Sequence, residues 1–363
     1  MSGGRFGRGR APNRACLKLA DWPARDRELW LAAVAPSDPF ADGGGTRACH
    51  RSRSNCKVVQ NYGRWLTFLA GQGLLDPHAH PADRITLEVV KAYVSELEGL
   101  QNRKNTVLAR LQDLGVMARV FAPTRDWSFI SRLASWVRAK PEIPQDKRSR
   151  LVGSDELYDL GLSLMAQAAT QSTPRLTAMA FRDGLMIALL ALRPMRRGNF
   201  ISLTIGEYLV QNGAGWSIVL PGSVTKTHAE LAFPWPEELI RPLEIYLAIH
   251  RQILAKLVNR WTAPVGSRLW VSSQGSPMTE IAFYDRIVKK TKAAFGRSIN
   301  PHLFRDAAAT TLAIHDPDHV RLAAPLLGHR SLATTEHYYQ QAQSLEATRM
   351  YAKVIVDRRH KPL

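Results

Sequence analysis

Apolar side chains recur at helical spacing in four successive segments between residues 55 and 140, and no other feature constrains the fold more. The first stripe contains Val58, Tyr62 and Leu69, and three similar stripes follow it. Apolar residues at this spacing lie on one face of a helix, and that face needs a partner to be buried. We therefore predict a small all-helical domain over residues 55–140.

Two prolines close this region. Pro141 and Pro144 stand within four residues of each other and are followed by a cluster of charged side chains. A proline disfavours helical backbone in the residue before it, and a charged segment has little to bury. We therefore predict an exposed linker over residues 141–153.

The second half of the chain mixes helical and strand patterns. Residues 154–190 are helical in period, and helical spacing returns after Pro236. Three short segments between them have strand composition, and the Asn212-Gly213 pair between the first two is a strong hairpin signal. The predicted fold class is mainly α with a small antiparallel β-sheet, and the strands are expected in residues 206–213, 216–220 and 230–233.

The chain is strongly basic. It has 49 Lys and Arg against 31 Asp and Glu, a formal net charge of +18. A protein with this excess usually binds a polyanion, and nucleic acid is the first candidate. Residues 1–54 are rich in Gly, Arg and Pro, so we expect a basic flexible N-terminal extension with at most a short helix near Leu29–Val34. Two interpretations stay open for it, a solvated tail and an arm that lies along phosphates.

Cysteine usage and hydropathy bear on the compartment. The three cysteines, Cys16, Cys49 and Cys56, form no C-x-x-C pair, so we expect free thiols and neither a zinc knuckle nor a disulfide framework. No apolar run approaches the roughly 18–20 residues of a membrane span, and no apolar core of a signal peptide follows the first arginines. We expect a cytoplasmic protein with access to the nucleoid.

Two segments near the C-terminus carry the chemistry. In Asn300-Pro-His302-Leu-Phe-Arg305, the histidine and the arginine are three residues apart, so they share one face of the helix that Pro301 can begin. A guanidinium beside an imidazole is suited to gripping a phosphate. Downstream, Leu327-Gly328-His329 is followed nine residues later by Tyr338.

In these segments the sequence resembles the tyrosine recombinase (phage integrase) family. That family has an H-x-L-R type box, an L-G-H box and a nucleophilic tyrosine nine residues later, and this chain matches all three in order and spacing. The resemblance implies an integrase-type catalytic domain over residues 154–343. It also implies a helical core-binding (SAM-like) domain over 55–140 that clamps DNA, and a tail over 344–363 that can pack on a neighbouring protomer or on its own domain.

The resemblance extends to two upstream positions. Counting seven residues back from Leu203 selects Arg196 as the family's first arginine, with Arg193 and Arg197 as competitors. Lys226, in the turn between the second and third expected strands, matches the catalytic lysine. The family commonly has an acidic residue three positions after the first arginine, and here that residue is Asn199.

The family's mechanism assigns each matched residue a role. Tyr338 attacks the phosphorus to form a 3′-phosphotyrosine, although a phenol with an ordinary pKa of about 10 needs activation first. Arg196 and Arg305 hold the non-bridging oxygens where charge develops, and His329 adds a hydrogen bond. Lys226 protonates the leaving 5′-oxygen, and His302 assists proton transfer.

The resemblance also implies partners and cofactors. The partners are double-stranded DNA at recombination sites, other copies of the chain in a tetramer on two duplexes, and accessory recombination proteins. Two guanidiniums and a lysine supply the positive charge, so no metal is expected, and no phosphate-binding loop for ATP is present in the sequence. We expect no cofactor, and we expect the chain to serve a mobile genetic element.

Two other functions would use similar residues or a similar scaffold. A type IB topoisomerase-like nicking-closing enzyme uses similar residues, but the clamp-type domain and the terminal segment favour recombination. A non-catalytic DNA-binding relative would have no need for Tyr338. Within the site, Tyr339 is the alternative nucleophile, since adjacent residues on a helix point about 100° apart.

Overall fold

The computed structural model describes residues 16–36, 47, 52–141, 151–213, 215–225, 228–258, 263–316 and 327. The chain divides into two compact units, residues 1–144 and 145–363. Each unit has its own hydrophobic core.

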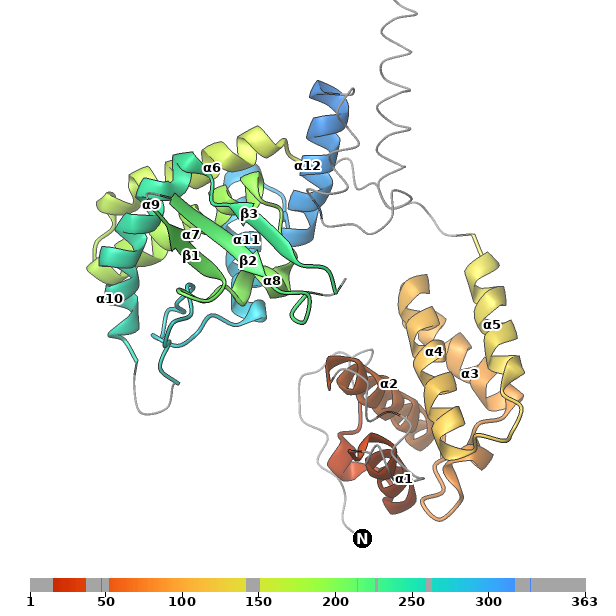
Figure 1. Ribbon diagram of the computed structural model, residues 1–363. Coiled ribbons are helices and arrows are strands. Elements are labelled where there is room, and N and C mark those ends of the chain that lie inside the picture. The colour runs from red at the N-terminus through yellow and green to blue at the C-terminus, as the bar shows by residue number, and fades with distance from the viewer. Residues whose placement is uncertain are drawn as a thin grey trace, which may run out of the picture. The chain divides into compact units, whose positions relative to one another are not determined.

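The first unit is entirely helical in its described part. Helix α4 is central because it packs against α1, α2 and α5, and the core between them includes Trp65, Tyr93 and Leu111. Figure 1 shows α2–α5 grouped around this core. The helices are α1 (Ala24–Val34), α2 (Ser52–Gly71), α3 (Leu87–Gly99), α4 (Lys104–Phe121) and α5 (Ser128–Ala139), with short 3₁₀ turns at Leu19–Asp21 and Pro81–Arg84.

The expectation of a flexible extension over residues 1–54 is wrong for residues 16–36. Trp22 and Trp30 are almost fully buried in the core of the first unit. The buried carboxylate of Asp26 accepts a hydrogen bond from Tyr62 Oη at 2.6 Å and pairs with the Arg84 guanidinium. Two tryptophans and a buried ion pair outweigh the polar composition around them, so this stretch folds onto α2 and α4.

A glycine on α2 lets the extension approach closely. The Leu17 backbone nitrogen donates to Gly63 O at 3.0 Å, and a Cβ added at Gly63 would stand 2.2 Å from Leu17 O. The predicted linker over 141–153 also extends too far, because Val152 is buried in the core of the second unit. Val152 stands just before the first helix of that unit and packs into its core. The two prolines that suggested the boundary carry no signal for this contact.

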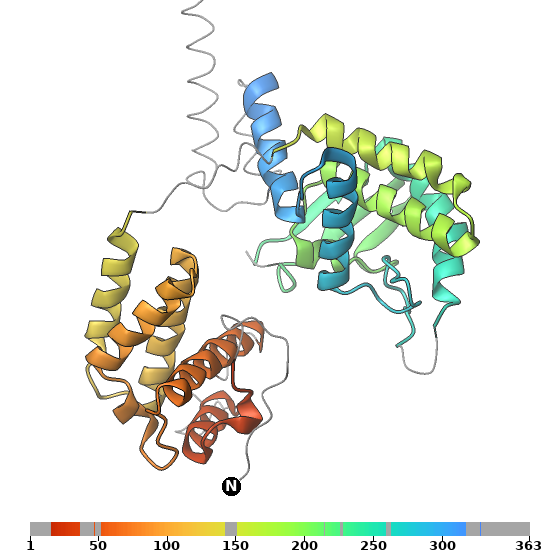
Figure 2. The same cartoon turned by 180° about the vertical axis from the view of Figure 1, so that it is seen from behind.

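The second unit is built around α7. Residues 185–191 of this helix are all buried, and its helical neighbours are seen from behind in Figure 2. Its elements are α6 (Ser154–Ala166), a 3₁₀ turn (Gln167–Thr170), α7 (Pro174–Leu192), α8 (Arg197–Ile201), β1 (Leu209–Asn212), β2 (Gly215–Leu220), β3 (Leu231–Pro234), a 3₁₀ turn (Glu237–Leu239), α9 (Ile240–Ile245), a π-helical turn (Tyr246–His250), α10 (Arg251–Ala255), α11 (Glu280–Phe295) and α12 (Pro301–His315).

The strands form an antiparallel sheet in the order β1-β2-β3. Leu209 pairs with Ile218, and Leu220 pairs with Leu231, so the apolar residues of the sheet face the core. Gly213 has a φ of +59°, a left-handed conformation that the Asn-Gly signal predicts for the first hairpin. The predicted fold class, mainly α with a small antiparallel β-sheet, is confirmed.

Helices α6 and α7 make close backbone contact through two glycines. A Cβ added at Gly161 would lie 2.6 Å from the Ala188 nitrogen, and one added at Gly184 would lie 2.6 Å from Gly161 O. The nearest atom at each glycine belongs to the backbone of the other helix, so a side chain at either position would force the helices apart. The contact therefore fixes α7 against α6, and α7 leads directly into Arg193–Arg196.

We expect Gly161→Ala to destabilise the second unit by roughly 1–3 kcal/mol, the usual cost of overpacking a close contact. Urea unfolding of the full chain, followed by circular dichroism, measures the loss. Gly71→Ala is the control, since Gly71 is also a helical glycine, the last residue of α2, and has no atom within 4 Å of the added Cβ. Equal stability of the two variants would contradict the close contact.

An ion network joins α7 to α11. The buried carboxylate of Asp183 accepts hydrogen bonds from Arg182 Nη2 at 2.6 Å and from Arg286 Nε at 2.9 Å. Removing one partner would leave a buried charge uncompensated, which is costly. The network therefore holds α11, whose first turns border the candidate site, against α7.

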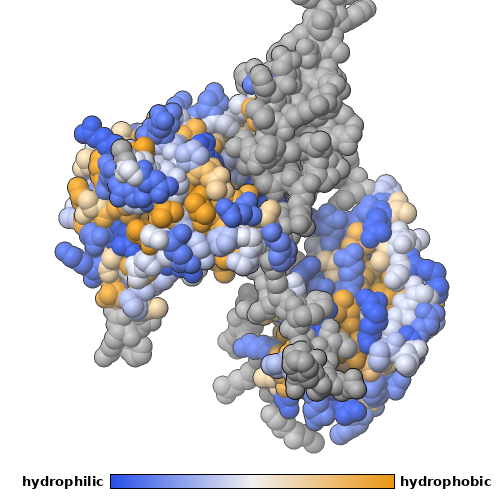
Figure 3. Space-filling model, in the orientation of Figure 1, coloured by the Kyte–Doolittle hydropathy of each residue, from blue (hydrophilic) through white to orange (hydrophobic). Residues whose placement is uncertain are grey.

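The visible face of each unit carries mostly hydrophilic residues with smaller apolar areas between them (Figure 3). Some exposed apolar surface is normal on a folded protein. No helix in the described part of the chain is long and apolar enough to span a bilayer.

Candidate active site

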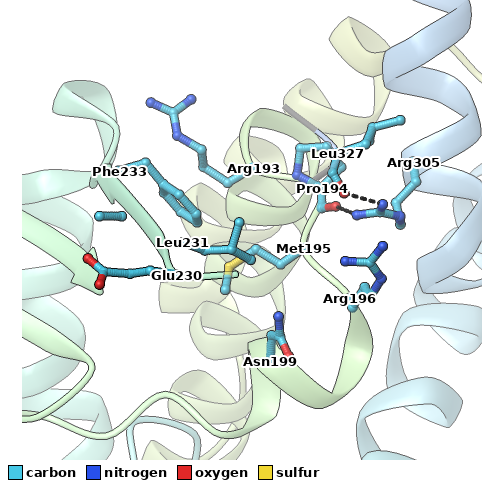
Figure 4. A pocket seen from close by; sticks show the side chains of 11 residues that line it. Arg193, Pro194, Met195, Arg196, Asn199, Glu230, Leu231, Phe233, Arg305 and Leu327 are labelled. Atoms are coloured by element: carbon cyan, nitrogen blue, oxygen red, sulfur yellow. Dashed lines mark hydrogen bonds between the residues drawn. The ribbon is translucent and has the colours of Figure 1, made fainter. Parts of the chain in front are cut away.

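Two of the predicted arginines meet at one cavity of about 440 Å³. Arg196 stands at the start of α8, and Arg305 comes from α12. Figure 4 shows their guanidinium groups next to each other, whereas the Arg193 side chain extends away from both. The facing wall of the cavity is formed by β3 and the residue before it, and it contains Glu230, Leu231, Ala232 and Phe233. Leu327 also lines the cavity.

Arg305 joins three segments that are far apart in the sequence. Its Nη1 donates to Pro194 O at 2.6 Å, and its Nη2 donates to Leu327 O at 2.5 Å. The residue is only 5% exposed. Pro194 precedes Arg196 by two residues, and Leu327 stands directly before Gly328-His329. One guanidinium therefore ties the first-arginine segment and the L-G-H segment to α12.

The start of α12 is defined by its cap. Asn300 Oδ1 accepts hydrogen bonds from the backbone nitrogens of His302 and Leu303, and Pro301 occupies the first helical position. His302 and Arg305 are thus one turn apart on the same face, as the sequence predicts. His302 is exposed and Arg305 is buried.

A second hollow of about 370 Å³ lies beside the first. Arg196, Arg305 and Met195 line both, so the two arginines stand between them. The second hollow also contains His302. Its remaining lining residues are Arg197, Tyr284, Asn300 and Pro301.

Lys226 lies outside the described residues, but the chain on either side of it is well held. Thr225 is fully buried, and its hydroxyl lies 2.8 Å from Ala229 O and 3.2 Å from Gly222 O. The His228 nitrogen donates to Thr225 O at 3.4 Å, with His228 at a φ of +55°. These contacts hold the described residues on the two sides of Lys226 to each other.

His329, Tyr338 and Tyr339 also lie outside the described residues. Asn199, the departure from the family's acidic position, is buried in α8 and lines the first cavity. It places an uncharged amide below Arg196, as Figure 4 shows. An amide can accept or donate a hydrogen bond there but adds no charge.

The electrostatic balance of the cavity is positive. Burial lowers the pKa of the Arg193 guanidinium, and the Glu238 carboxylate offsets part of that shift. Arginine keeps its charge in proteins despite such shifts. Within the described part of the chain, no three His, Cys, Asp or Glu side chains gather as a metal site.

Several site features have no signal in the sequence. The carbonyl acceptors of Arg305, Pro194 O and Leu327 O, are backbone atoms that any residue could supply. The pairing of Arg197 with Glu280 links α8 to α11 across 83 positions. Only the folded chain brings these groups together.

Comparison with known proteins finds one family. Residues 162–344 match the model of the phage integrase family. Tyrosine recombinase XerD of Pseudomonas aeruginosa is 32% identical over 167 residues, 46% of this chain and 52% of that protein. Tyrosine recombinase XerD of Vibrio cholerae is 27% identical over 255 residues, 69% of this chain and 74% of that protein. The chain thus spans about half the length of the Pseudomonas relative.

Two solved structures have a similar fold. XerH site-specific recombinase bound to difH substrate superimposes with a TM-score of 0.53 at 16% identity, over 90% of this chain and 94% of that one. The Tn1549 transposon integrase in complex with transposon right end DNA gives a TM-score of 0.50 at 17% identity, over 89% and 98%. At these identities the likeness shows the fold alone.

Proposed function

Since the chain belongs to the phage integrase family, we propose that it is a site-specific DNA recombinase that cleaves and rejoins DNA through a 3′-phosphotyrosine intermediate. The observation that carries the proposal is the position of Arg305. Its guanidinium lies beside Arg196 and is hydrogen-bonded to the residue that precedes Gly328-His329. A phosphodiester at this point would meet two guanidiniums, and that of Arg305 is already held by two carbonyl oxygens. A preorganised donor of this kind supplies the electrostatic stabilisation that a phosphorane requires.

The proposed chemistry is a pair of transesterifications. Tyr338 Oη forms a bond to phosphorus while the bond from phosphorus to the 5′-oxygen breaks, and Lys226 gives that oxygen its proton. Arg196, Arg305 and His329 hold the non-bridging oxygens, and His302 assists proton transfer. The 5′-hydroxyl of a partner strand then displaces the tyrosine, so the energy of the phosphodiester is conserved.

The proposed partners follow from the same family. They are duplex DNA at recombination sites and three further copies of the chain in a tetramer, with accessory proteins and a mobile element as the setting. The net charge of +18 supports a polyanionic substrate. We propose that the helical domain, including residues 16–36, forms the clamp on DNA and that the protein acts at the nucleoid. No observation favours the topoisomerase-like or the non-catalytic alternative.

Covalent capture tests the proposal. Duplexes that the full chain retains from sheared DNA of its source are rebuilt with a nick close to each candidate cleavage position, so that the released fragment diffuses away. We expect a protein–DNA adduct that survives denaturant, with a free 5′-hydroxyl on the released fragment. Strand exchange between two labelled duplexes, rather than relaxation of supercoils alone, identifies a recombinase. Absence of any adduct on every retained duplex would overturn the proposal.

A further inference from the structure

The second hollow has a cationic residue that the proposed chemistry does not use. Arg197 lines it together with Arg196, Arg305 and His302. Among the described residues that line this hollow, none is a carboxylate. A concave surface with three guanidiniums and an imidazole is suited to an anion.

Arg197 is held in place by two contacts from α11. Its Nε donates to Glu280 Oε2 at 2.9 Å, and its guanidinium carbon lies 6.0 Å from the centre of the Tyr284 ring. The side chain is still 45% exposed. A long side chain that is already oriented loses less entropy when it binds a ligand, and a guanidinium still has donors besides its Nε.

The two hollows share Arg196 and Arg305, which the proposed function places on the scissile phosphate. A DNA strand crosses these residues as a continuous polymer with one negative charge per 3.4 Å of helix rise. The phosphate next to the scissile one must therefore lie to one side of the two arginines. The second hollow offers that phosphate a positively charged site.

We propose that the second hollow is a subsite for the phosphate adjacent to the scissile phosphate and that Arg197 binds it. This inference rests on the proposed function. The consequence concerns the register of the DNA strand in the active site. By holding the neighbouring phosphate, Arg197 fixes which phosphodiester stands between Arg196 and Arg305. Glu280 and Tyr284 are positioning residues that keep the guanidinium in the hollow.

The test measures the affinity for a duplex that forms the covalent adduct, with each phosphate near the cleavage point replaced singly by a neutral methylphosphonate. We expect Arg197→Gln to weaken binding of the unmodified duplex and to lower the slope of log affinity against log salt by about 0.9. Neutralising the adjacent phosphate is expected to weaken DNA binding by the wild type, by about the same factor as Arg197→Gln weakens binding of the unmodified duplex. The same change should have little effect on Arg197→Gln, because the two changes remove the same contact.

Arg175→Gln is the matched control. Arg175 is an exposed arginine in the first turn of α7, about 25 Å from its other end at 1.5 Å per residue. The Arg175→Gln variant removes the same charge as Arg197→Gln. We expect any loss of DNA affinity in this variant to be the same on every modified duplex. Circular dichroism checks that each variant is folded.

Two results would overturn the inference. Either the effects of Arg197→Gln and of the neutral phosphates are independent at every position, or they couple only at the scissile phosphate. Binding is measured with Tyr338→Phe added to every protein, so that no adduct forms during the measurement. These results are therefore distinct from failure of the proposed function, which shows as a protein with Tyr338 that forms no adduct.

Discussion

Tyr338→Phe is expected to abolish the covalent protein–DNA adduct while leaving affinity for DNA largely unchanged. Phenylalanine keeps the ring and its packing but lacks the oxygen that bonds to phosphorus, so no other step of the reaction can follow. The measurement is the yield of denaturant-resistant adduct on a nicked duplex, compared with the wild type at equal occupancy.

Tyr339→Phe is the matched control for this change. It removes a hydroxyl from the adjacent residue, which would point about 100° away on a helix, and we expect it to retain adduct formation. The reverse pattern, with Tyr339→Phe inactive and Tyr338→Phe active, would move the nucleophile by one residue. Adduct formation by both variants would exclude either tyrosine as the sole nucleophile.

Arg305→Lys is expected to reduce the rate of adduct formation by about 10²- to 10³-fold, the scale seen when one preorganised donor to a developing charge is lost. Lysine keeps the charge but lacks the planar fork that donates at once to Pro194 O and Leu327 O. The variant therefore loses a phosphate ligand and the link between three site segments. Single-turnover kinetics at saturating DNA measure the effect.

Amide hydrogen exchange measures the structural role of Arg305 separately from the rate. Without the two carbonyl contacts, peptides containing Pro194 and Leu327 are expected to exchange their amide hydrogens faster than in the wild type. Arg175→Lys, at the far end of α7, is the control and should change neither exchange nor rate. A rate for Arg305→Lys close to that of the wild type would contradict the proposed role of this guanidinium.

The helices and the small sheet could be predicted because their signals are local. Apolar stripes at helical spacing mark α2–α5, and Asn212-Gly213 marks the first hairpin. The sequence did not predict that residues 16–36 are folded, because the contacts that hold them are not local. Trp22 and Trp30 are buried in a core shared with distant helices, and Asp26 bonds to Tyr62 and Arg84, 36 and 58 residues away. Local composition carries no signal for these contacts.

The candidate site also combines features that are local in the sequence with contacts that are not. The spacing of His302 and Arg305 on one helix face is a property of helical geometry, so the sequence alone determined it, and the order of the motifs indicated the family. Counting back from Leu203 had already selected Arg196 over Arg193. Only the tertiary structure decided that the guanidinium of Arg305 lies beside Arg196 and is bonded to the carbonyls of Pro194 and Leu327, and that Arg197 is held by α11. Spacing along a helix depends on neighbouring residues, whereas contacts between segments 22 to 111 residues apart depend on how close-packed helices and strands fit together.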